Sequence, residues 1–175
     1  MHASLRVMIV AASTWGWAAV GTAEVKVELS EMHICCNACV KGIENAVKDI
    51  PGVTVEVDKE AATTVVKADD ARAAEKAIEA IAHAGFHGVS NHADLKMKDD
   101  SGAAKGSVAR LELTNIHNCC GGCMKAVKGA VKDVKGVTGD TLKPKETRFV
   151  VEGRFSPAEV IAALNAAGFH AKIVR

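Results

Sequence analysis

The pattern of hydrophobic and polar positions after residue 23 repeats one order of elements twice. In the first copy, Val25, Val27 and Leu29 alternate with polar residues, which predicts a half-buried strand, and apolar residues at helical spacing follow it. Alternation over 53–57 and again over 64–66 predicts two strands joined by a polar turn. A second amphipathic helix and a short last strand complete the order strand, helix, strand, strand, helix, strand.

The second copy predicts the same order. Leu111 and Leu113 alternate with charged residues, and a helix-spaced apolar set follows. The next hairpin is less regular because Pro144 lies in its turn, and Ser156-Pro157 is a strong signal for the start of the last helix. Each copy therefore predicts an α+β, ferredoxin-like βαββαβ sandwich, in which two helices cover a four-stranded antiparallel sheet.

Two motifs show that the copies are a duplication. The segment His33–Cys39 recurs at His117–Cys123, and Ala84–His87 recurs at Ala167–His170. Matching motifs in the same order and at nearly the same separation predict tandem domains, each with a core of its own.

The first 23 residues differ in composition from the rest. A positively charged start, an apolar run over 7–20 and small residues before position 24 are typical of a cleaved secretory signal peptide. The alternative is an uncleaved membrane anchor, although the run is short for a bilayer span of about 20 residues. We expect export to the periplasm or beyond, with no membrane span after cleavage. The expected organisation is a signal peptide over 1–23, units over 24–91 and 107–175, and a flexible, solvated linker over 92–106.

Composition excludes one class of function. The net charge of +1 supplies no basic field for a phosphate backbone. Aromatic residues make up 3% of the chain, and there is no tyrosine, so stacking platforms for bases are scarce. We therefore expect no nucleic-acid partner.

The candidate chemistry lies in the cysteines, all six of which fall in the two repeated motifs. Each triplet joins a predicted strand to a predicted helix, where unpaired backbone N–H groups and the helix dipole favour thiolates. Thiolates bind soft metal ions. The sequence predicts one metal site in each unit, formed by Cys35, Cys36 and Cys39 in the first and by Cys119, Cys120 and Cys123 in the second.

Both units resemble the heavy-metal-associated domain family of copper chaperones, copper-transporting ATPase amino-termini and the periplasmic mercury-binding protein. The resemblance rests on Cys36-Asn37-Ala38-Cys39 and Cys120-Gly121-Gly122-Cys123, on the turns Gly52-Val53 and Gly136-Val137, and on the Ala-Gly-Phe segments late in each unit. It implies that Cys36 with Cys39, and Cys120 with Cys123, bind a soft ion, with copper(I) favoured and zinc or mercury as alternatives. It also implies transfer of the ion to a metal-transporting membrane protein or to another metal-binding protein.

The chain also departs from the family's pattern. The family usually has a methionine and then a serine or threonine before the C-x-x-C pair, whereas this chain has Ile34-Cys35 and Asn118-Cys119. Cys35 and Cys119 are expected as a supporting third sulfur, or as partners in a disulfide with Cys39 or Cys123 when no metal is bound. One histidine with three cysteines would also suit tetrahedral zinc.

The histidines and phenylalanines near these motifs each allow two interpretations, one functional and one structural. His33 and His117 are candidate ligands or supports for the ligands, and otherwise residues at a strand end. Phe86 and Phe169 align with a position beside the metal in the family, and otherwise are core aromatics.

The function that these features predict is binding of a soft metal ion for transport, transfer or sequestration outside the cytoplasm, without catalysis. Two alternatives stay open. One is a thiol–disulfide oxidoreductase that uses C-x-x-C, and the other is a structural module whose cysteines staple a loop.

Overall fold

A computed structural model describes residues 24–174, which contain two units of the same architecture. The expected signal peptide over 1–23 lies outside the described residues. Among residues 24–174, no helix is both long enough and apolar enough to span a bilayer.

The first unit contains four strands and two helices in the predicted order. Its elements are β1 (Val25–Ser30), α1 (Asn37–Val47), β2 (Val53–Asp58), β3 (Thr63–Ala68), α2 (Ala71–His83) and β4 (Val89–Ser90). The sheet order is β2-β3-β1-β4, and the paired strands are antiparallel. The register places Val27 opposite Val66, both fully buried under the helices, which confirms the predicted strand alternation.

The second unit repeats this arrangement with small irregularities. Its elements are β5 (Val108–Thr114), α3 (Gly121–Lys132), β6 (Val137–Asp140), β7 (Phe149–Phe155), α4 (Pro157–Ala166) and β8 (Lys172–Ile173). The sheet order β6-β7-β5-β8 corresponds strand by strand to that of the first unit. A register shift between Val137 and Gly139 makes the β6–β7 hairpin irregular, as the sequence indicated, and a second shift lies between β5 and β7. The two sheets and four helices confirm the ferredoxin-like α+β prediction.

The helix boundaries follow from local chemistry. Asp70 caps α2, because its carboxylate accepts a hydrogen bond from the N–H of Ala73 at 2.7 Å. Ser156 precedes α4 with Pro157 in the first turn, as predicted, although its side chain makes no capping hydrogen bond. Gly85 and Gly168 follow α2 and α4 with positive φ angles, which is the usual end of a helix.

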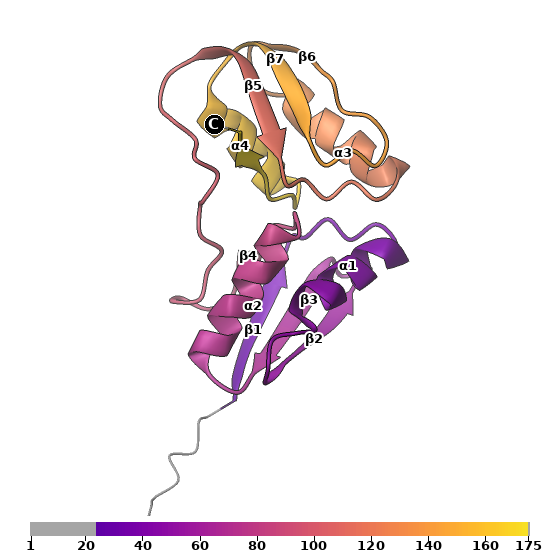
Figure 1. Ribbon diagram of the computed structural model, residues 1–175, viewed down its shortest axis with the longest axis vertical. Helices are drawn as coiled ribbons and strands as arrows, with labels where there is room; N and C mark the ends of the chain where they lie inside the picture. Colours follow the sequence, from indigo (N-terminus) through magenta and orange to yellow (C-terminus); the bar gives the residue numbers. More distant parts are fainter. Residues whose placement is uncertain (1–23, 175) are drawn as a thin grey trace, which may run out of the picture.

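The two units pack against each other (Figure 1). Their buried side chains form one continuous core. Phe86 and Phe169 pair as an antiparallel bridge between the units. The N–H of His87 donates to the Gly168 carbonyl at 3.0 Å, and the N–H of His170 donates to the Gly85 carbonyl at 3.1 Å. These reciprocal contacts relate the units by an approximate two-fold axis.

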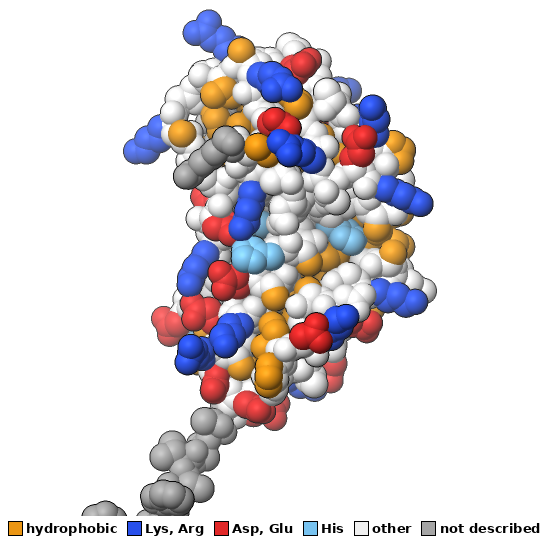
Figure 2. Space-filling model, viewed as in Figure 1, with side chains coloured by type: hydrophobic (Ala, Val, Ile, Leu, Met, Phe, Trp, Pro, Cys, Tyr) orange, Lys and Arg blue, Asp and Glu red, His pale blue; other side chains and the backbone are white. Residues whose placement is uncertain are grey.

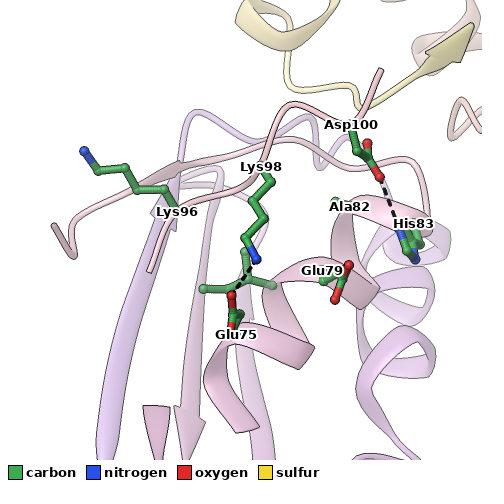
Figure 3. Close-up of a pocket in the computed structure, with 8 residues that line it drawn as sticks. Glu75, Glu79, Ala82, His83, Lys96, Lys98 and Asp100 are labelled. Atoms are coloured by element: carbon green, nitrogen blue, oxygen red, sulfur yellow. Dashed lines mark hydrogen bonds and ion pairs between the residues drawn. The ribbon is translucent and has the colours of Figure 1, made fainter. Parts of the chain in front are cut away.

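The segment over 92–106 is mostly exposed, as its polar composition predicts, but it is attached to both units at several points. It runs along one side of both units (Figure 1). Leu95 and Ser101 are buried, and the Ser101 carbonyl accepts a hydrogen bond from the N–H of Ile173. Figure 3 shows how the segment attaches to α2: Lys98 pairs with Glu75, and Asp100 pairs with His83. The segment is therefore anchored at a few points, while most of its residues remain exposed.

Candidate metal site between the two units

The two cysteine triplets lie on loops that the strands direct toward the boundary between the units. The first loop leads from β1 to α1, and the N–H of Met32 anchors it by donating to the Ala62 carbonyl at 3.1 Å. The second leads from β5 to α3, and Ile116 makes the corresponding bond to the Thr147 carbonyl at 3.2 Å. Met32 and Ile116 are themselves buried, so both loops are held in place by the core.

Helix phase decides which sulfurs are buried. Cys36 and Cys120 directly precede α1 and α3, with extended backbones, and both are partly exposed. Cys39 and Cys123 lie in the first helical turns and are fully buried. The third cysteines differ slightly, since Cys35 is exposed and Cys119 is partly buried.

The six thiols form one cluster, and the expectation of a separate cluster in each unit is therefore wrong. Sulfur–sulfur contacts between the units are as short as those within them. Cys35 Sγ lies 3.3 Å from Cys120 Sγ and 3.6 Å from Cys123 Sγ, while Cys119 Sγ lies 3.6 Å from Cys36 Sγ and 3.7 Å from Cys39 Sγ. At the centre, Cys39 and Cys123 approach to 3.9 Å. The single-unit sequence pattern contains no information on this approach, because it depends on how the units pack.

The cluster consists of free thiols at the amino-terminal ends of two helices. Both helix dipoles place partial positive charge at the sulfurs. Backbone N–H groups of Cys123 and Gly122, together with the thiol of Cys35, lower the pKa of Cys120 to about 6. This end of the cluster therefore holds a thiolate near neutral pH, which is the form that binds metal.

The pKa values of the two central cysteines shift in opposite directions. The contact with Cys123 lowers the pKa of Cys39, and the same contact, reinforced by burial, raises the pKa of Cys123. Two buried sulfurs this close cannot both ionise without a cation between them. Partial burial, together with contacts to neighbouring thiols, raises the pKa of Cys35 to about 12 and also raises that of Cys119. The cluster therefore has donor atoms ready for a cation whose charge would replace the shared protons.

His33 and His117 lie beside the cluster, and each packs on an aromatic ring of the other unit. The His33 ring stacks on Phe169 with centroids 4.5 Å apart, and the His117 ring lies 4.1 Å from that of Phe86. Both Nε2 atoms are buried without a hydrogen-bond partner. Phe86 and Phe169 are fully buried, so they are core aromatics and also neighbours of the cluster. Figure 2 shows histidine side chains at the level where the units meet.

The residues that replace the family's usual loop residues have structural roles. Ile34 is buried in the core. Asn118, also buried, donates from Nδ2 to the carbonyls of Lys143 and Glu146, each at 2.9 Å, and so fixes the loop between β6 and β7. Met32 and Met124 both pack against the core.

Three combinations of side chains bring potential ligand atoms within 4.8 Å of one another. The first is Cys39, His117, Cys119 and Cys123, the second is His33, Cys35 and Cys123, and the third is Cys35, Cys36 and Cys120. All three draw residues from both units. A three-cysteine, one-histidine set suits a tetrahedral ion such as zinc, whereas sulfur-only sets suit copper(I).

A second group of residues, which the sequence did not predict as a site, lies farther along the boundary. The rings of His87 and His170 are nearly parallel, with centroids 6.2 Å apart, and both Nδ1 atoms are buried without a partner. His170 Nε2 lies 2.7 Å from Asp100 Oδ1. The repeat of Gly-Phe-His in both units was the available signal, but it identified no pairing between them.

Comparison with known proteins gives a family match over the first unit. Residues 22–87 match the heavy-metal-associated domain family. The N-terminal soluble domains of Bacillus subtilis CopA are 19% identical, with 87% of this chain and 95% of that chain covered and a TM-score of 0.34. Oxidized MerP from Ralstonia metallidurans CH34 is 21% identical, with coverages of 40% and 100% and a TM-score of 0.33. At such low TM-scores these two likenesses carry no argument.

Proposed function

We propose that this protein binds soft metal ions at one thiol cluster shared by its two units, because residues 22–87 match the heavy-metal-associated domain family and the second unit repeats their motif and sheet order. The observation that carries the proposal is the convergence of all six cysteines, with sulfur–sulfur contacts of 3.3–3.9 Å. Copper(I) is the favoured ion, since it takes thiolate ligands in low coordination numbers.

The protein is proposed to carry, transfer or sequester the ion rather than to catalyse a reaction. Ligand exchange with a partner needs accessible sulfur, and Cys35 supplies it at the surface, while Cys39 and Cys123 retain the ion inside. A metal-transporting membrane protein or another thiol-rich protein is the proposed recipient. We also propose that the protein is exported and that its mature amino-terminus lies near Glu24. Amino-terminal sequencing of the purified protein tests this, and a sequence that begins at Met1 would contradict it.

Titration of the reduced chain with copper(I) in the absence of oxygen tests the function. A chromophoric copper(I) chelator present as competitor should lose about two ions per chain to the protein, because six thiolates supply three ligands to each of two ions. The matched control replaces Cys36, Cys39, Cys120 and Cys123 by serine and should leave the chelator loaded. A wild-type chain that removes no copper from the chelator would overturn the proposal.

A further inference from the structure

Cys35 and Cys119 each contact both sulfurs of the C-x-x-C pair in the opposite unit. In its own unit, each contacts only one sulfur of the pair. Cys36, Cys39 and Cys119 form a closed triangle, with sulfur–sulfur distances of 3.8, 3.6 and 3.7 Å. Cys120, Cys123 and Cys35 form a second triangle, with distances of 3.8, 3.3 and 3.6 Å. The approximate two-fold axis exchanges these triangles, and each of the six sulfurs is used once.

The triplets within one unit do not close in the same way. Cys35 reaches Cys39 at 3.8 Å, and Cys119 reaches Cys123 at 3.6 Å. Among the described cysteines, however, no such contact joins Cys35 to Cys36 or Cys119 to Cys120. Cys39 and Cys123 also close a triangle with Cys35 and another with Cys119. Among contacts of 3.9 Å or less between the described cysteines, however, only the two crossed triangles together use each of the six sulfurs once.

The size of both triangles fits a three-coordinate soft ion. The distance from the centre of an equilateral triangle to each corner is the edge length divided by the square root of three. For these triangles the distance from a central ion to each sulfur would be about 2.1 Å. Metal–thiolate bonds are about 2.3 Å long. A small outward movement of the sulfurs would therefore complete the bonds, without a rearrangement of the loops.

We propose that each C-x-x-C pair binds one monovalent soft ion, copper(I) by chemical class, together with the extra cysteine of the opposite unit. One site is Cys36, Cys39 and Cys119, and the other is Cys120, Cys123 and Cys35. This inference rests on the proposed metal-binding function and specifies its ligands. Each ion forms three metal–sulfur bonds and displaces the protons that remain on those three sulfurs, with no change in oxidation state. The bound ions join the units, and the dipoles of α1 and α3 stabilise the negative charge of the two sites.

Single-site backgrounds provide the test. In a chain with Cys120→Ser and Cys123→Ser, only the pair of the first unit remains, and Cys119→Ser is then compared with Cys35→Ser. Crossed ligation predicts the larger loss of copper(I) affinity from Cys119→Ser, with the sulfur count from X-ray absorption falling from three to two. Because even outer-sphere partners of a metal are worth roughly 10–100-fold in affinity, loss of a ligand should cost at least as much.

The reciprocal background, Cys36→Ser with Cys39→Ser, should reverse the order, with the larger loss from Cys35→Ser. Circular dichroism of the metal-free variants controls for folding. Larger losses from the cysteine of the same unit, or equal losses from both, would overturn the crossed sites while leaving metal binding intact. A tetrahedral ion on Cys39, His117, Cys119 and Cys123, recognised by one nitrogen in the absorption spectrum, would overturn them as well. Failure of the unmodified chain to bind copper(I) at all would instead defeat the proposed function.

Discussion

At the residue scale, two glycines allow the backbones of the units to touch. Gly168 has a φ of +82°, and a Cβ atom built there would lie 2.2 Å from the backbone nitrogen of His33. Gly85 has a φ of +88°, and its Cβ would lie 2.4 Å from the backbone nitrogen of His117. Each glycine therefore lies against the loop that carries the other unit's histidine and cysteines. Any side chain at these positions would move that loop away from the cluster.

We predict that Gly168→Ala destabilises the reduced, metal-free chain by more than about 1–2 kcal/mol, the typical strain of a left-handed residue, because the backbone contact adds to that strain. Gly129→Ala is the matched control, since it lies inside α3 with nothing within 4 Å of the added atom. This control should stabilise the chain by about 0.5–1 kcal/mol. Urea unfolding measures both, and an unchanged midpoint for Gly168→Ala would contradict the close approach.

The same two glycines illustrate what the sequence could predict. Their role at the ends of α2 and α4 follows from local rules and is confirmed by their φ angles. Their contact with the opposite unit could not be predicted, because no local pattern specifies how two folded units face each other. The same holds for the cysteines. The sequence predicted that they lie at the start of a helix, but it did not predict that the two triplets form one cluster.

At the element scale, the segment over 92–106 has anchoring contacts that its composition did not predict. Its lysines, aspartates and glycines are typical of a flexible linker. In the structure, Asp100 contacts side chains from both units: Oδ1 pairs with His170, and Oδ2 pairs with His83 and Lys172. Hydrogen bonds from Lys172 and His170 lower the pKa of Asp100 to about 2 against the opposing effect of its burial. One carboxylate thereby ties the connecting segment to α2 and to the end of the chain.

Replacing Asp100 by alanine should destabilise the chain by about 1–2 kcal/mol, because the side chain of His170, only 3% exposed, loses the partner of its Nε2 atom. The control is Lys98→Ala, which breaks an exposed pair with Glu75 on the same segment and should change stability little. Thermal unfolding at neutral pH compares the two. Equal midpoints for both variants would show that the segment is not anchored through Asp100.

At the scale of the whole molecule, the boundary between the units contains three distinct groups of side chains. One end holds the cysteine cluster, the middle is closed by Phe86 and Phe169, and the other end pairs His87 with His170. A disturbance of the packing at one end therefore alters the distance between thiols at the other. Metal binding across the boundary and stability of the boundary are expected to be coupled for this reason.

The histidine end is expected to make the stability of the boundary depend on pH. Burial and the neighbouring His170 together lower the pKa of His87 to about 4, against the opposing effect of Asp99. In the unfolded chain the pKa is near 6.5, so the unfolded state binds more protons between these values, and the stabilising effect, complete above pH 6.5, is lost as the pH falls toward 4. Asp100, with its pKa lowered to about 2, contributes the same sign only below about pH 3.8, which separates the two effects.

We therefore predict that the thermal midpoint of the reduced, metal-free chain falls between pH 7 and pH 4.5, and that His87→Asn reduces this fall. After allowance for the accessible part of the ring, the His87 contribution is expected to be about 1–2 kcal/mol. His33, whose pKa is also lowered by burial, acts in the same direction, so a part of the fall should persist in the variant. Parallel pH profiles for the two chains would show that His87 does not sense pH. A fall confined to pH values below 4 would assign the effect to the carboxylates instead, because the imidazole of His87 would then titrate equally in the folded and unfolded chain.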